Sequence, residues 1–171
     1  ASHGAALDVL ACVEPPPDLA AIARAAGLPA ADIVERLTVE RRRQMAEAVA
    51  RALPGQAPEV RITVGKTFVE VIRHVLRHDV DLVVKGAEPL AGHRPLLFAS
   101  TDQHLLRKCP CPVWLRMPGA RTRPRTILAA VDVDDWDASE PETLADLNRR
   151  VIETALRLGG DADSVVHVVH A

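Results

Sequence analysis

The sequence predicts a three-layer α/β/α sandwich with a mostly parallel sheet, a Rossmann-like fold. Apolar runs of strand length alternate along the chain with longer segments in which apolar residues recur at helical spacing. The strand-like runs, such as residues 7–13 and 126–133, are rich in Val, Leu and Ile and show little polar alternation. This is typical of strands covered by helices on both faces, which gives three layers.

The composition is that of a folded protein without a bulk polyanion as its partner. The chain has 171 residues, 48% of them hydrophobic, and a formal net charge of −2. Its basic residues are scattered, which argues against nucleic-acid binding. No apolar run approaches the roughly 20 residues of a membrane span, and the first residues lack the features of a signal peptide. Three cysteines suit a reducing compartment, so we expect a cytoplasmic protein.

The first half of the chain predicts two strands with a long helix between them. Residues 7–13 form a strand that three prolines bring to an end, because proline cannot continue a hydrogen-bonded ladder. We expect a loop with some helix-forming residues next, then a helix over residues 32–53 and a strand over residues 59–64. Three arginines at 41–43 fall largely off the apolar face of that helix, which indicates a solvated surface rather than a phosphate-binding patch.

The trio Gly65, Lys66 and Thr67 has the last letters of a phosphate-binding P-loop. That motif needs a further glycine five positions earlier, where Val60 stands inside the strand. Thr67 and Glu70 instead have the spacing of a capping box. They predict the start of a helix with one apolar face, and we reject the P-loop.

Two patterns could in principle hold a metal ion. His74 and His78 lie four residues apart on the helix that follows Thr67, and Cys109 and Cys111 flank a proline. Neither pair has an evident third ligand. We therefore expect exposed histidines near a helix C-terminus and small thiols at a strand entrance, with no metal site and no catalytic residue assigned.

Residues 81–118 have the order strand, glycine-bearing loop, helix, strand. Residues 81–85 are a short apolar run ended by Gly86, residues 101–108 suit a helix, and residues 112–117 suit a second strand. This order predicts two parallel strands joined by a helical crossover. The loop that leads from such a strand to a helix N-terminus is a usual place for a bound anion such as a phosphate.

This stretch resembles the carboxyl-terminal signature of the universal stress protein family, and most closely that of its tandem, E-type members. Members of the family that bind ATP carry the motif G-x2-G-x9-G-[ST], then a leucine-rich helix and a P-C-P-V strand. Here residues 105–113 read LLRKCPCPV, which fits that end of the signature. Registered on it, the motif positions fall on Gly86, Pro89, Ala99 and Ser100. The resemblance implies the adenine nucleotide alpha hydrolase-like form of the Rossmann-like fold.

Two of the three motif glycines are thus replaced, by Pro89 and Ala99. Glycine lets the backbone lie against phosphates, and proline also removes an N–H donor. The resemblance therefore implies a non-enzymatic stress-response binding module that has lost nucleotide affinity and has no cofactor. The alternative is an ATP-binding member with slow ATP hydrolysis that uses Gly86, Ser100 and Asp132. Asp132 takes the place of an aspartate that meets adenosine in ATP-binding members.

Three parts are expected along the chain. Residues 1–118 resemble a first domain of the family without its first strand and helix, and residues 119–125 form a linker with glycine, proline and basic residues. Residues 126–171 resemble the opening strand, helix and strand of a second domain. Ser139 and Glu142 have capping-box spacing at the start of this helix.

We also expect a homodimer. The strand at 112–117 carries Trp114 and Met117 and few charges, which suits an association surface. The resemblance implies that the absent first strand would be central in the sheet, beside residues 81–85. The segment 127–133 is the best candidate to fill that place, and its short linker favours a domain swap between two chains.

Overall fold

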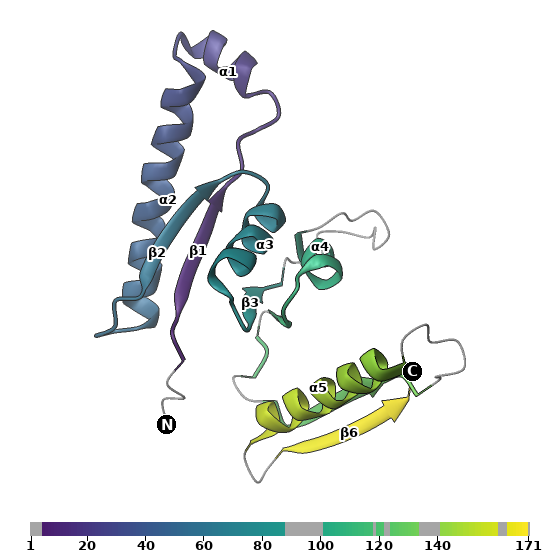
Figure 1. Cartoon of the computed structure of the whole chain (residues 1–171). Helices are drawn as coiled ribbons and strands as arrows, with labels where there is room; N and C mark the ends of the chain where they lie inside the picture. Colours follow the sequence, from purple (N-terminus) through teal and green to yellow (C-terminus); the bar gives the residue numbers. More distant parts are fainter. Residues whose placement is uncertain are drawn as a thin grey trace. The chain divides into compact units, whose positions relative to one another are not determined.

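The computed structural model of the chain describes residues 5–87, 101–117, 119–121, 124–133, 141–160 and 164–170. The chain divides into two compact units, residues 1–118 and residues 119–171 (Figure 1). Strands and helices alternate through both, which confirms the predicted α/β fold.

The first unit holds four strands and four helices within its described residues. In chain order these are β1 (Asp8–Val13), α1 (Leu19–Ala26), α2 (Ala30–Ala52), β2 (Glu59–Val64), α3 (Thr67–His78), β3 (Val83–Gly86), α4 (Thr101–Lys108) and β4 (Val113–Arg116). The second unit holds β5 (Thr126–Val131), α5 (Pro141–Gly159) and β6 (Val165–His170).

Every strand pairing in the described residues is parallel. β1 pairs with β2, β3 with β4 and β5 with β6. In each pair the first residues of the two strands lie opposite each other and the pairing continues residue by residue. Helices α2 and α3 flank the β1–β2 pair, and α5 packs on β5 and β6 (Figure 1). The described strands form three two-stranded sheets, and none of them bridges β1 and β3.

The buried core of each unit is small. In the first unit, Ala11 and Val13 of β1 and Val75 of α3 are buried, and Leu105 of α4 is fully buried. In the second unit the buried residues are Ala129 and Val131 of β5 with Ala155 of α5. Many large apolar side chains stay exposed, among them Leu76, Val84 and Leu128.

Helix α1 was expected to be a loop with only some helix-forming residues. Instead residues 19–26 form a regular helix that ends at Gly27, whose φ of 63° lies in the left-handed region that favours glycine. The amide N–H of Gly27 donates to carbonyls of the last turn. The segment is rich in alanine, the residue with the highest helix propensity, and the prolines before it do not prevent a helix.

Helix α3 begins at Thr67 as expected, but the capping box is wrong. Lys66 occupies the cap position and makes no side-chain capping hydrogen bond. The amide of Thr67 donates to the carboxylate of Glu14, 3.4 Å away at the end of β1, and Glu70 pairs with Arg73 at 2.7 Å. A carboxylate distant in sequence thus assists the helix N-terminus, where it also suits the helix dipole.

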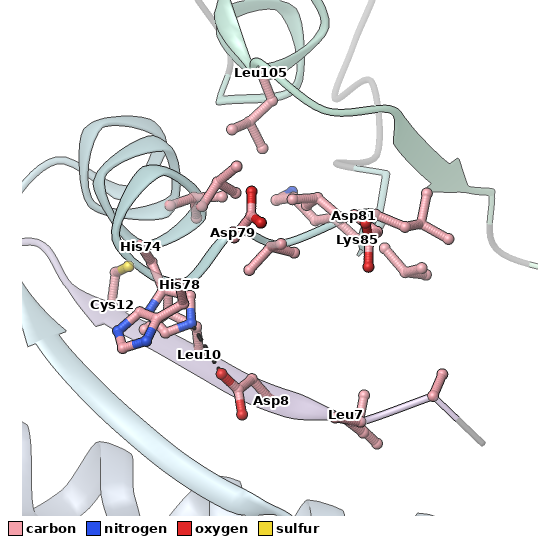
Figure 2. A pocket seen from close by; sticks show the side chains of 18 of the residues that line it. Leu7, Asp8, Leu10, Cys12, His74, His78, Asp79, Asp81, Lys85 and Leu105 are labelled. Atoms are coloured by element: carbon pink, nitrogen blue, oxygen red, sulfur yellow. Dashed lines mark hydrogen bonds and ion pairs between the residues drawn. The ribbon is translucent and has the colours of Figure 1, made fainter. Parts of the chain in front are cut away.

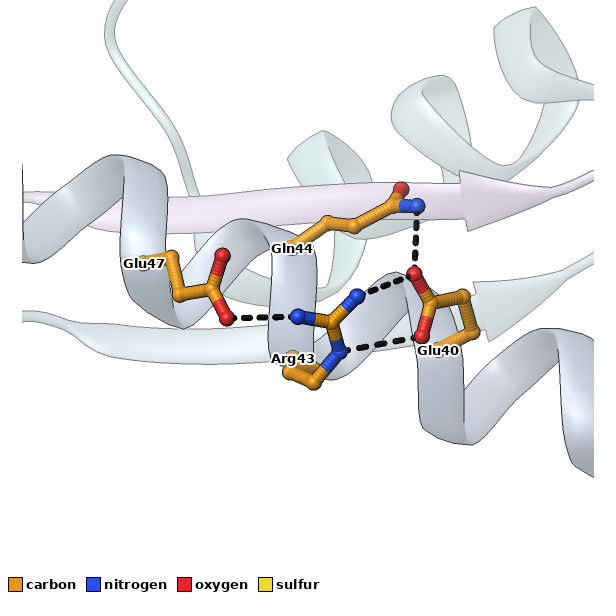
Figure 3. Close-up of polar contacts among 4 residues, drawn as sticks. All are labelled: Glu40, Arg43, Gln44 and Glu47. Carbon is orange, nitrogen blue, oxygen red and sulfur yellow. Dashed lines mark hydrogen bonds and ion pairs between the residues drawn. The ribbon is translucent and has the colours of Figure 1, made fainter.

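The arginine run on α2 forms a solvated surface, as predicted. Figure 3 shows the guanidinium of Arg43 between two carboxylates of its own helix, at 2.7 Å from both Glu40 and Glu47. Gln44 donates a further hydrogen bond to Glu40. Hydrogen bonds from Arg43 and Gln44 lower the pKa of Glu40. Because the positive charge of Arg43 is already paired with Glu40 and Glu47, Arg43 offers little to a phosphate.

Candidate functional site

The loop with the nucleotide-binding resemblance joins the end of β3 to the start of α4. β3 ends at Gly86, and the next amide, of Ala87, donates to the carbonyl of Arg116 at 2.8 Å, which continues the pairing with β4. Helix α4 begins at Thr101. Of the motif positions, Pro89, Ala99 and Ser100 lie outside the described residues.

A partly buried ion pair occupies the position where this loop meets the helix. Lys85 Nζ donates to Asp102 Oδ1 at 2.8 Å and to the carbonyl of Gly86 at 3.0 Å. Asp102 is only 8% exposed and stands in the first turn of α4. The N-terminal turn of a helix attracts anions. Here the chain supplies its own anion, and Lys85 already neutralises it.

Asp102 and His104, two residues apart on α4, contact different partners. Asp102 is engaged by Lys85, while the ring of His104 stacks on Phe68 with ring centroids 4.2 Å apart. The ammonium of Lys108 lies 5.4 Å from the centre of the same Phe68 ring. These contacts attach α4 to α3.

In the second unit, Asp132 directly follows β5. Its amide donates to Asn148 Oδ1 at 3.1 Å, and Asn148 Nδ2 donates to the carbonyl of Asp132. The side-chain amide of Asn148 on α5 therefore holds the backbone at the end of β5 through two hydrogen bonds. Gly86 belongs to the first unit and Asp132 to the second, so each predicted nucleotide residue is placed only within its own unit.

A groove of about 590 Å³ lies between β1 and β3, with α3 along it and Leu105 of α4 at its wall (Figure 2). Its lining is largely apolar and includes Leu10, Cys12 and Val84. Polar side chains gather near the start of β1, where His74 and His78 of α3 lie close to Asp8. The sequence motifs did not indicate this groove.

Both histidines were expected to be exposed, but only His78 is. The side chain of His74 is only 11% exposed, and its Nε2 lies 3.2 Å from Asp8 Oδ2. The rings of His74 and His78 are 4.3 Å apart. No three His, Cys, Asp or Glu side chains in the described part of the chain gather as a metal site. No helix in that part is long and apolar enough to cross a membrane.

The three cysteines are free thiols. The sulfur atoms of Cys109 and Cys111 are 3.7 Å apart between α4 and β4. Burial, together with the neighbouring Cys109, raises the pKa of Cys111 to about 11. Burial also raises the pKa of Cys12. Since the thiolate is the reactive form, neither of these two is set up as a nucleophile.

Comparison with known proteins identifies related sequences. Residues 1–115 match the model of the universal stress protein family. The Universal stress protein E homolog of Haemophilus influenzae is 36% identical over 98 residues, 57% of this chain and 30% of the relative. Universal stress protein E of Escherichia coli K12 is 32% identical over 107 residues, 62% of this chain and 33% of the relative. The chain spans about a third of the length of these curated relatives.

A solved structure shares the fold. The crystal structure of a functionally unknown protein from Pseudomonas aeruginosa PAO1 superposes on 97% of this chain and 50% of that protein, with a TM-score of 0.58 at 22% identity. The superposition shows the same Rossmann-like arrangement of strands and helices.

Proposed function

This chain belongs to the universal stress protein family, and we propose that it serves there as a non-enzymatic, stress-response binding module rather than as an ATPase. The observation that carries the proposal is the ion pair between Lys85 and Asp102 at the N-terminus of α4. It puts a carboxylate of the chain in the first turn of α4, the helix that follows the loop resembling the nucleotide motif.

The electrostatics of this ion pair oppose a phosphate at the same position. A second negative charge about 5 Å from the Asp102 carboxylate would be repelled by about 3 kcal/mol at an effective dielectric constant near 20. The positive charge of Lys85 reduces this repulsion, but its ammonium already donates to Asp102 and to the carbonyl of Gly86 and is not directed at a phosphate alone.

The loop sequence acts in the same direction. Pro89 and Ala99 stand at two glycine positions of the nucleotide motif. Pro89 has no N–H to donate, and the Cβ of Ala99 keeps the backbone from lying as close to a phosphate as glycine allows, so each of the two phosphate contacts is lost or weakened, at about 1.5–3 kcal/mol for a full loss. Two such losses would weaken a micromolar site by roughly two to four orders of magnitude.

Two further statements belong to the proposal. The free thiols of Cys12, Cys109 and Cys111 suit a reducing compartment, so we place the protein in the cytoplasm. The second unit begins with a strand that resembles the first strand of a family domain. We therefore assign residues 126–171 to the opening part of a second domain of the family, joined to the first by residues 119–125.

Titration with labelled ATP and Mg²⁺ tests the proposal, with released phosphate measured in parallel. We expect no saturable binding at low-micromolar ATP and no phosphate release. Asp102→Asn should bind ATP several-fold more tightly than the wild type, because it removes the repelling charge. Glu142→Gln is the matched control, since it removes an exposed carboxylate from the first turn of α5, and it should leave binding unchanged.

The alternative function, ATP binding with slow hydrolysis through Gly86, Ser100 and Asp132, predicts the opposite results. Saturable low-micromolar binding with phosphate release by the wild type would establish it and overturn the proposal. If weak binding is found, Ser100→Ala should reduce it more than His74→Ala, because only Ser100 stands at a motif position.

A further inference from the structure

The segment between α4 and β4 brings two thiols together. Helix α4 ends at Lys108 and β4 begins at Val113, and the chain bends at Pro110 and Cys111 between them. The sulfur atoms of Cys109 and Cys111 lie 3.7 Å apart, and both residues are half-buried. A small reagent can therefore reach two neighbouring sulfur atoms at one place.

Backbone hydrogen bonds hold this segment on both sides. The amide of Cys109 donates to the carbonyl of Leu105 at 2.9 Å, and Leu105 is fully buried. The carbonyl of Pro112 accepts from the amide of Val83 at 3.0 Å, beside the first paired residues of β3 and β4. Because the backbone is held at both ends, the two sulfur atoms are kept close to each other.

The separation of the two sulfur atoms suits the formation of a bond between them. A disulfide bond is about 2.05 Å long, so the sulfur atoms would approach by about 1.7 Å from their present 3.7 Å. Rotation of the cysteine side chains between staggered rotamers moves the sulfur atoms by distances of this size. A disulfide that is partly exposed is of the labile kind that reductants reopen.

Two thiols without a third ligand do not make a zinc site. Zinc in proteins has four ligands in structural sites and three protein ligands in catalytic sites. In the part of the chain that the structure describes, no third His, Cys, Asp or Glu side chain joins the two cysteines as a metal site. Thiol oxidation, in contrast, needs only the two sulfur atoms.

The surroundings give the two thiols different roles. Burial and the neighbouring Cys109 raise the pKa of Cys111 to about 11, so Cys111 keeps its proton at neutral pH. Its S–H group can then donate to Cys109 Sγ and stabilise negative charge on that sulfur. Since the thiolate is the reactive form, Cys109 is the sulfur that reacts first.

We propose that Cys109 and Cys111 form a reversible oxidation site, at which hydrogen peroxide converts the two thiols into an intramolecular disulfide. The thiolate of Cys109 attacks the peroxide, the O–O bond breaks, and Cys109 becomes a sulfenic acid while the first water is released. Cys111 then attacks the sulfenic sulfur. The S–S bond forms, the S–O bond breaks, and the hydroxyl group leaves with the proton of Cys111 as a second water. The two sulfur atoms together lose two electrons, which reduce the peroxide to water.

The second thiol makes the oxidation reversible. A sulfenic acid without a neighbouring thiol goes on to the sulfinic acid, which is in general irreversible, whereas a disulfide is reopened by a dithiol reductant. Disulfides in a reducing compartment are usually transient and often sense the redox state. The oxidation site depends neither on the loop after β3 nor on the ion pair that carries the proposed function.

Treatment of the reduced wild-type chain with hydrogen peroxide tests the site, with free thiols then blocked by N-ethylmaleimide and the chain digested with trypsin. Cleavage after Lys108 and Arg116 gives one peptide, residues 109–116, that holds both cysteines. Mass spectrometry should show that this peptide has lost two hydrogen atoms, and dithiothreitol should restore its mass. Cys12 is the internal control and should be oxidised at least tenfold more slowly, because burial raises its pKa and no second thiol is near. Oxygen addition to the peptide, a disulfide to a second chain, or equally fast oxidation of Cys12 overturns the proposal.

Single variants separate the roles of the two thiols. In Cys111→Ser, peroxide should carry Cys109 to the sulfinic acid, seen as two oxygen atoms added to the same peptide. In Cys109→Ser, Cys111 should be oxidised at least tenfold more slowly than the wild-type pair, because burial still raises its pKa. Cys12→Ser is the matched control and should form the disulfide at the wild-type rate. If Cys109→Ser is oxidised as fast as the wild type, or if Cys109 stays unoxidised in Cys111→Ser, the proposal is wrong.

Discussion

At the scale of residues, the ion pair between Lys85 and Asp102 determines the charge at the N-terminus of α4. The sequence marks Gly86 as the end of a strand and residues 101–108 as a helix, but it does not show that Lys85 reaches across to Asp102. That pairing depends on where α4 begins in space. The side chain of Asp102 is only 12% exposed, so its partner matters for stability as well as for ligand binding.

We predict that Asp102→Ala lowers the free energy of unfolding by about 1–3 kcal/mol, because it leaves the Lys85 ammonium partly buried without its carboxylate. Urea denaturation measures this change. The double variant Asp102→Ala with Lys85→Met should recover part of the loss, since the uncompensated charge is gone. An additive double variant would show that the two side chains do not depend on each other.

Cys111 gives a pH-dependent prediction. Burial and the neighbouring Cys109 raise its pKa to about 11, so the thiol stays protonated at neutral pH and its thiolate forms only as the pH rises toward that value. Alkylation by iodoacetamide, followed by peptide mass spectrometry, should therefore be slow at neutral pH. The rate at Cys111 should still be rising beyond the ordinary thiol range. A rate that reaches its plateau near pH 8.5, the ordinary value for a cysteine, would contradict the environment described for Cys111.

At the scale of elements, α4 offers two adjacent leucines with opposite environments. Leu105 is fully buried, whereas Leu106 is 59% exposed. Leu105→Ala should lower the free energy of unfolding by about 2–5 kcal/mol, because it leaves a cavity in the small core. Leu106→Ala should change it by less than about 0.5 kcal/mol. Equal effects in thermal or urea unfolding would show that α4 does not pack as described.

The element boundaries show which local signals are sufficient. Residues 59–64 and 101–108 are placed as the sequence predicts, because short apolar runs and turn residues define their ends locally. The start of α3 is also correct, yet its support comes from Glu14, which lies at the end of a different strand. The capping-box prediction failed because local spacing cannot reveal a carboxylate that only the fold brings near.

At the scale of the whole molecule, the sequence indicates parallel strands but does not indicate which strands hydrogen-bond to one another. The described strands form three separate pairs, since the groove between β1 and β3 holds no described strand. The contact between His74 and Asp8 across one end of that groove joins residues far apart in the chain. No local sequence pattern predicts such a contact, which is why the histidines were expected to be exposed.

The central claim is that this member of the universal stress protein family has lost its nucleotide site. Calorimetric titration of ATP with Mg²⁺ into the wild-type chain tests it most directly, because heat reports binding whether or not ATP is hydrolysed. The Lys85–Asp102 ion pair and the substitutions at Pro89 and Ala99 predict no binding isotherm at low-micromolar concentrations. A saturable isotherm with a low-micromolar Kd would contradict the claim.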